Sequence, residues 1–117
     1  MYIRITSFSY DPEREDEFIA IADAARDEMK AIEGLQTIRG IRVADGKLII
    51  GAAYDTEASA NAAMPKIQGI LGKLAAILNA PPEMQDGPVI WELYFSVAGI
   101  SPNPKAPLRQ GFLLYRC

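Results

Sequence analysis

The dipeptide Asp45-Gly46 is the feature of this sequence that most constrains its fold. It lies between two short strand-like runs, Ile41-Arg42-Val43-Ala44 and Lys47-Leu48-Ile49-Ile50. Asp-Gly favours the tight type I′ turn, whose twist matches that of paired antiparallel strands. The sequence therefore predicts a β-hairpin with strands over residues 35–43 and 47–54.

Amphipathic helix patterns precede and follow this hairpin. In the first, Asp11 offers an N-cap and Pro12 suits the first helical position, and Gly34 is placed as the stop. Between them, apolar residues recur at spacings of three and four: Phe18, Ile21, Ala25, Met29 and Ile32. The second helix is expected to begin after a cap at Asp55 or Thr56, and Pro65 should split it near Met64.

Strand patterns flank the two helices. Residues 2–9 alternate in polarity, and residues 89–97 are rich in β-branched and aromatic side chains. The predicted fold class is therefore α+β, a ferredoxin-like βαββαβ domain over residues 1–97, with a four-stranded antiparallel sheet and two helices on one face. Residues 98–117 form a Pro/Gly-rich C-terminal arm, which either docks on the body or on a partner, or stays disordered.

The composition narrows the classes of partner. With 117 residues and a net charge of −3, the chain fits one domain and lacks the clustered basic residues of nucleic-acid-binding proteins. No apolar run approaches the length of a membrane span, the opening residues do not resemble a signal peptide, and the only cysteine is Cys117. We therefore expect a cytoplasmic protein without nucleic-acid or membrane partners. Half of the residues are hydrophobic, which fits either an oligomer interface or an apolar-rich monomer.

The sequence contains no histidine, the commonest general base and a frequent metal ligand. This argues against a Ser-His-Asp hydrolase and against most transition-metal sites, so no cofactor or metal is predicted. The carboxylates of the first helix and of the segment from Glu83 to Asp86 form either a solvated acidic surface or a site for a hard cation.

The order of elements resembles the dimeric α/β-barrel superfamily, whose best-known branch is the antibiotic-biosynthesis-monooxygenase-like domain. The likeness lies in three segments: Tyr2-Ile3-Arg4-Ile5-Thr6, the helix end Met29-Lys30-Ala31-Ile32-Glu33-Gly34-Leu35, and Gly87-Pro88-Val89-Ile90-Trp91-Glu92-Leu93. The resemblance implies a homodimer in which two open sheet faces form a barrel. It also implies a small-molecule pocket between sheet and helices. Haem-degrading members use a histidine ligand, which this chain lacks.

The side-chain facing of the strands suggests where a ligand would bind. We expect Ile3 and Ile5 to face the helices, and Tyr2 and Phe8 to lie on the uncovered face with Arg4. Trp91 would then point between sheet and helices, either as core or stacked on an aromatic ligand. Arg4 and Glu92 would form a cross-strand pair in the barrel, which is either structural or an anchor for an anionic ligand. Arg39 adds positive charge, and Tyr54 and Tyr94 could donate hydroxyl groups.

Cofactor-free oxygenases of the resembled superfamily use an asparagine and a tryptophan near the second helix to orient an aromatic substrate. Asn61 lies in this helix, but no tryptophan follows it. The first hypothesis is a homodimeric small-molecule-binding protein acting as a cofactor-free monooxygenase on an aromatic or phenolic compound. In it Asn61 orients the substrate and Arg4 or Arg39 stabilises oxyanion charge. The alternative is a non-catalytic binding or assembly domain, so the sequence leaves open whether the chain is an enzyme.

Overall fold

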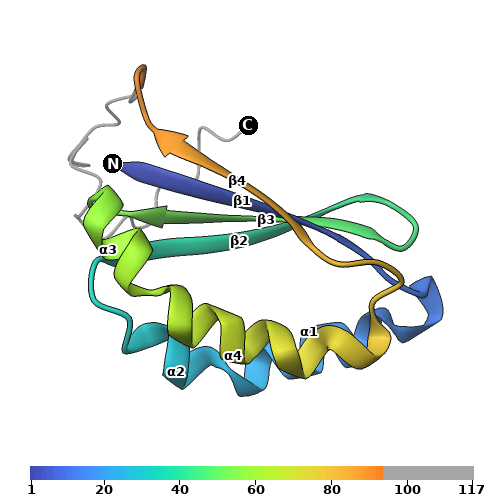
Figure 1. Ribbon diagram of the computed structural model, residues 1–117. Helices are drawn as coiled ribbons and strands as arrows, with labels where there is room; N and C mark the ends of the chain where they lie inside the picture. The colour runs from blue at the N-terminus through green and yellow to red at the C-terminus, as the bar shows by residue number, and fades with distance from the viewer. Residues whose placement is uncertain (94–117) are drawn as a thin grey trace, which may run out of the picture.

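The computed structural model describes residues 1–93 (Figure 1), so Tyr94, the predicted domain boundary at residue 97 and the C-terminal arm lie outside the described residues. Its strands are β1 (Tyr2–Ser9), β2 (Leu35–Ala44), β3 (Lys47–Tyr54) and β4 (Glu83–Pro88). Its helices are α1 (Glu15–Ala24), α2 (Arg26–Lys30), α3 (Glu57–Ala62) and α4 (Met64–Leu74), with short 3₁₀ turns η1 (Pro12–Arg14) and η2 (Ala75–Ile77).

The strands form one antiparallel sheet in the order β2-β3-β1-β4, and the helices cover one of its faces (Figure 1). This confirms the predicted ferredoxin-like α+β fold. α1 and α4 lie next to each other beneath the sheet. No helix among residues 1–93 has both the length and the apolar character that crossing a membrane requires.

Local signals in the sequence explain most element boundaries. Gly46 adopts a φ of 74° in the hairpin turn, and its carbonyl accepts a 2.9 Å hydrogen bond from the Tyr10 amide. Gly34, with a φ of 84°, ends the first helical region as predicted. Asp11 caps η1, and the Thr56 hydroxyl accepts from the Ser59 amide at the start of α3. The second helical region breaks next to Pro65, because proline cannot donate the hydrogen bond of a continuous helix.

The fourth strand was predicted in the wrong place. Residues 89–93 have no regular structure, and the strand that pairs with β1 is Glu83–Pro88. The prediction followed the high β propensity of residues 89–97, but cross-strand pairing outweighs propensity at the edge of a sheet. An edge strand also tolerates Gly87 and Pro88, because its outer amide groups need no partner strand.

The predicted facing of β1 was also wrong. Tyr2 and Phe8 are buried against the helices, whereas Ile5 is 43% exposed on the open face. An alternating pattern defines two faces but does not say which one the helices cover. Here the larger aromatic side chains fill the core. They belong to two buried clusters, one of Tyr2, Ile32, Ala52, Tyr54, Ala60 and Ala63, and the other of Phe8, Tyr10, Phe18, Leu48, Leu74 and Ile77.

The facing of β2 and β3 follows from their pairing. Gly40 and Gly51 both lie in regular pairs, and the register shifts fall between Leu35 and Thr37 and between Arg42 and Ala44. Because Ile5 pairs with Gly51, which in turn pairs with Arg39, the Arg39 side chain is on the open face.

Candidate functional site

A buried arginine joins β1, β4 and α3. Arg4 is only 5% exposed, and its Nε and Nη2 donate to the same Asp86 carboxylate oxygen at 3.2 and 3.0 Å. Its Nη1 donates to the Ala60 carbonyl at 3.0 Å. That carbonyl belongs to the last turn of α3, where a cation is favoured by the exposed carbonyl groups and the helix dipole. Arg4 therefore ties β4 and the end of α3 to the centre of the sheet.

Two tyrosines, Tyr2 and Tyr54, lie beside the Arg4–Asp86 ion pair. The ring of Tyr54 is fully buried, and its centroid lies 5.7 Å from the Arg4 guanidinium carbon. Burial raises the pKa of Tyr54, and the positive charge of Arg4 acts in the opposite direction. Burial also raises the pKa of Tyr2, followed by the negative charge of Asp86. Both phenols are thus held neutral beside the ion pair.

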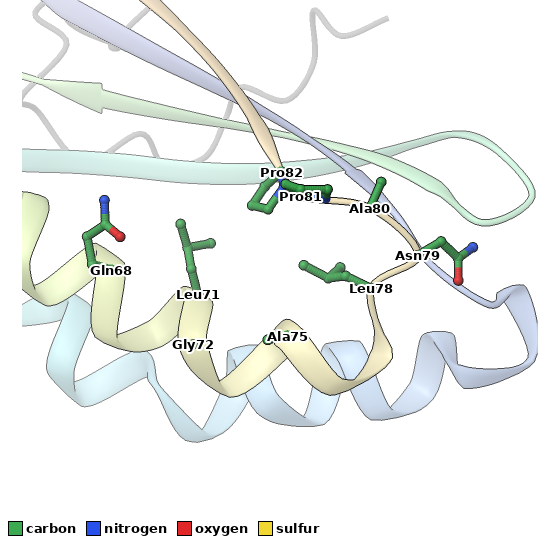
Figure 2. Close-up of a pocket in the computed structure, with 9 residues that line it drawn as sticks. All are labelled: Gln68, Leu71, Gly72, Ala75, Leu78, Asn79, Ala80, Pro81 and Pro82. Carbon is green, nitrogen blue, oxygen red and sulfur yellow. The ribbon is translucent and has the colours of Figure 1, made fainter.

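A pocket of about 520 Å³ opens between α4 and the connection that leads into β4. Figure 2 shows Leu71 and Leu78 directed toward each other across it, with Pro81 and Pro82 above. The lining residues are largely apolar, and two of them, Gln68 and Asn79, carry side-chain amides. The Asn79 amide is directed away from Leu71 and Leu78 in Figure 2. Its lining consists of Gln68, Leu71, Gly72, Ala75, Leu78, Asn79, Ala80, Pro81 and Pro82.

The helix contributes to this pocket through one stripe of residues. Gln68, Leu71 and Gly72 of α4 and Ala75, the first residue of η2, are spaced three, four and seven apart, which places them on one side of this helical region. The neighbouring stripe of Ile70, Leu74 and Ile77 is buried in the core. A Cβ atom added at Gly72 would meet no atom within 4 Å, so the glycine leaves open space there. The absence of a side chain widens the pocket.

The structure brings the predicted site residues together only in part. Arg4 and Tyr54 are in contact, as described above, but neither lines the pocket. Arg39 is on the open face, and Asn61 lies exposed on α3. The roles predicted for these residues stay predictions.

The expectation for Trp91 and Glu92 depended on the misplaced strand. Trp91 is 75% exposed and lies beyond the end of β4, so it does not point between sheet and helices. The residue opposite Arg4 in the register is Asp86, not Glu92, because β4 begins six residues earlier than predicted. The sequence did show Asp86, in an acidic segment before Gly87-Pro88, but it was considered there only as surface or cation ligand.

Gln68 and Asn79 were missed by reasoning from the sequence. Gln68 is the one polar member of its helical stripe, and Asn79 begins the Asn79-Ala80-Pro81-Pro82 connection. Neither position indicates a binding site in the sequence alone, because only the fold brings Gln68 and Asn79 to the same pocket. Among residues 1–93, no cluster of three or more acidic, cysteine or histidine side chains is arranged to hold a metal ion.

Comparison with known proteins identifies the fold. The sequence matches no protein-family model and no curated protein. The structure is similar to a monooxygenase of Streptomyces coelicolor solved with the ligand nanaomycin D, with a TM-score of 0.69, 16% identity, and coverage of 81% of this chain and 92% of that one.

Two further solved structures show the same likeness. A candidate antibiotic biosynthesis monooxygenase from Deinococcus radiodurans has a TM-score of 0.69 at 10% identity. The match covers 83% of this chain and 100% of the other. A protein of unknown function from Nitrosomonas europaea has a TM-score of 0.67 at 13% identity, with 82% and 95% covered. This chain thus has the ferredoxin-like fold found in antibiotic-biosynthesis-monooxygenase-like proteins, as the resemblance implied.

Proposed function

We propose that this chain binds a flat, largely apolar small molecule in the pocket between α4 and residues 78–82. We further propose that it acts on this molecule, an aromatic or phenolic compound, as a cofactor-free monooxygenase. The pocket itself carries the proposal. Its volume of about 520 Å³ falls in the range of about 300–1,000 Å³ typical of small-molecule sites, and its walls are apolar with a few polar groups. The fold shared with a monooxygenase that binds nanaomycin D supports the same conclusion.

The reaction oxidises an activated CH₂ group of the substrate. The group loses a proton, and the resulting carbanion transfers one electron to O₂. The carbon radical and superoxide combine into a C–O bond, and protonation gives a hydroperoxide. Loss of water from the hydroperoxide leaves a carbonyl. Two C–H bonds are broken, one oxygen atom enters the product, and the other leaves as water, so CH₂ and O₂ become C=O and H₂O.

The pocket residues would position the substrate and stabilise charge. The side-chain amide of Gln68 offers N–H donors to an oxygen on which negative charge develops. Because no ionisable side chain among residues 1–93 is part of the lining, water is the proposed acceptor of the proton. Gln68, Gly72, Ala75 and Asn79 are exposed, so water and O₂ can enter.

Two glycines of α4 provide a matched test of the pocket. Gly72 lines the pocket and Gly69 does not, yet an added Cβ atom meets open space at both positions. Leucine is a better helix former than glycine, so both Gly72→Leu and Gly69→Leu should fold. With anthrone as probe, whose CH₂ lies between two rings and opposite a carbonyl, Gly72→Leu should lower binding and O₂ uptake at least tenfold. Gly69→Leu should leave both unchanged.

Other results would separate the two functional hypotheses. Anthrone binding without O₂ uptake would replace the enzyme with a binding protein. Equal behaviour of the two leucine variants would place any activity outside this pocket. O₂ uptake by Asn61→Ala tests the role predicted for that residue, since Asn61 is not part of the pocket lining.

We also propose that the chain forms a homodimer through the open face of its sheet. Ile5 and Ile41 are 43% and 58% exposed there, and no helix among the described residues covers this face (Figure 1). A sheet face that carries isoleucines is usually buried against another layer, and a second copy of the chain supplies one. Sedimentation analysis would show a dimer, and a monomer at micromolar concentration would contradict the proposal.

A further inference from the structure

The two edges of the open sheet face carry opposite charges. The register places Arg39 of β2 on this face at one edge, and Glu83 and Gln85 of β4 on the same face at the other edge. No ion pair among residues 1–93 includes Arg39 or Glu83. The other charged side chain that the paired strand positions put on this face is Lys47, at the hairpin end of β3. One edge of the open face is therefore basic and the other acidic.

The two central strands of this face combine large and small side chains. A Cβ atom added at Gly51 would meet no atom within 4 Å, so open space lies beside the exposed Ile5 at the middle of the face. Each neighbouring pair of β1 and β3 on this face also joins an isoleucine to a small residue. The pairs are Ile3 with Ala53, Ile5 with Gly51, and Ser7 with Ile49.

A two-fold axis restricts how a second copy can cover this face. In aligned packing, the strands of the two sheets stay within about 30° of each other, so the axis between them runs along the strands or across them. An axis along the strands sets β2 against the partner's β4, and β3 against the partner's β1. An axis across the strands sets each strand against its own copy. It gathers both Arg39 side chains at one edge and both Glu83 side chains at the other, where like charges repel.

We propose that two copies of the chain pair with the axis along the strands, and that Arg39 and Glu83 select this orientation. Arg39 then opposes the partner's Gln85, and the partner's Glu83 lies two residues farther along β4. An arginine side chain can reach that carboxylate across sheets about 10 Å apart. Complementary charges of this kind fix the orientation of an interface more than its total affinity. The proposal rests on the proposed homodimer and is independent of the pocket.

The centre of the interface is complementary in size in this orientation. A two-fold axis along the strands allows no shift along them, so each residue of β1 opposes the partner's copy of the residue that it pairs with in its own sheet. Ile5 therefore opposes the partner's Gly51 and fills the open space there. The pairs of isoleucine with a small residue recur between the two copies in the same way. Such interdigitation is how two sheets pack face to face.

An exchange of the two charges tests the orientation. In a symmetric dimer, Arg39→Glu and Glu83→Arg each replace two attractive contacts by two repulsive ones. Each should weaken self-association about fivefold in sedimentation at low salt, and the double variant should return it to the wild-type value. The two residues lie on opposite edges of one sheet, so this recovery cannot come from a contact within one chain. Both are exposed, and the stability of the monomer should not change.

Net charge is controlled by a position away from the face. Lys66→Glu on α4 changes the net charge as Arg39→Glu does and should leave self-association unchanged. Glu83→Arg brings the net charge of −3 closer to zero, so an effect of net charge alone would strengthen the dimer. Weakening by both single variants therefore requires the specific contact.

The outcomes separate the orientation from the dimer. A wild-type dimer that neither single variant weakens, or a double variant that stays weakened, would overturn the orientation and leave the homodimer in place. Equal weakening by Lys66→Glu and Arg39→Glu would also overturn it. A wild-type monomer at micromolar concentration would overturn the homodimer and the orientation together, and would leave the binding of anthrone in the pocket as a separate question.

Discussion

The two faces of the sheet differ in a way that polarity alone does not predict. The face beneath the helices buries an arginine, Arg4, together with Tyr2 and Phe8, whereas the open face exposes Ile5 and Ile41. Arg4 tolerates burial because Asp86 and the Ala60 carbonyl satisfy its donors. The comparison teaches that hydrogen bonds from neighbouring groups decide whether a charge can be buried. The exposed isoleucines of the open face are the observation behind the proposed dimer.

The largest predicted difference in stability is between substitutions at two adjacent residues on opposite faces of β1. Phe8 is buried, and its ring lies 5.2 Å from that of Phe18 in an edge-on arrangement. Phe8→Ala should lower the free energy of unfolding by about 3–5 kcal/mol, through lost burial and an unfilled cavity. Ser7→Ala, one residue away on the open face, should change it by less than about 0.5 kcal/mol. Urea denaturation measures both, and similar losses would contradict the assignment of the faces.

The next effect concerns the buried ion pair on the same face. Asp86→Ala leaves Arg4 buried without its carboxylate, and breaking a fully buried pair costs about 3–5 kcal/mol. Because the Asp86 side chain is 36% exposed, we expect a smaller loss of about 2–3 kcal/mol in urea denaturation. Gln85→Ala on the open face should have little effect. The double variant Arg4→Met/Asp86→Ala should recover part of the loss, and no recovery would show that the charge itself is not the cause.

The sequence predicted well the features that depend on local chemistry. The Asp45-Gly46 turn, the Gly34 stop, the Thr56 cap and the break at Pro65 each depend on the backbone preferences of one or two residues. These signals were sufficient for the order of elements up to α4 and for the fold class.

The predictions that failed concern features that depend on residues far apart in the chain. The position of β4 follows from its register with β1, in which Asp86 lies opposite Arg4 across more than eighty positions of sequence. The covered face of β1 depends on which side the helices pack, and the pocket needs α4 and residues 78–82 together. Because β4 begins six residues earlier than predicted, neither Trp91 nor Glu92 lies at the position expected for it. An error in one strand therefore changed several site predictions together.

The proposed dimer provides a third comparison, between two equally exposed isoleucines. Ile5 on the open face is 43% exposed and Ile19 on α1 is 45% exposed. Ile5→Asp should weaken self-association at least tenfold, about 1.4 kcal/mol, because it places a charge in the proposed interface. Ile19→Asp should not weaken it. Sedimentation over a range of concentrations measures both, and equal weakening would place the interface elsewhere.

The smallest effect concerns the edge of the covered face, where β2 meets α1. Glu15 accepts hydrogen bonds from Arg42 and, at 2.6 Å, from the buried Tyr10 hydroxyl. These bonds lower the pKa of Glu15 from 4.5 to about 2, with Arg42 the larger cause. Burial and the same carboxylate raise the pKa of Tyr10 to about 12.

The pH dependence of stability follows from the lowered pKa of Glu15. Between pH 4.5 and about 2 the unfolded chain binds more protons at Glu15, so its contribution is complete above pH 4.5 and is lost as the pH falls through about 2. Arg42→Gln should flatten the dependence of the urea midpoint on pH in this window. Arg39→Gln removes the same charge from the open face of the same strand and should leave the slope unchanged. Equal flattening in both variants would mean that net charge, and not the contact between Glu15 and Arg42, controls acid stability at this edge.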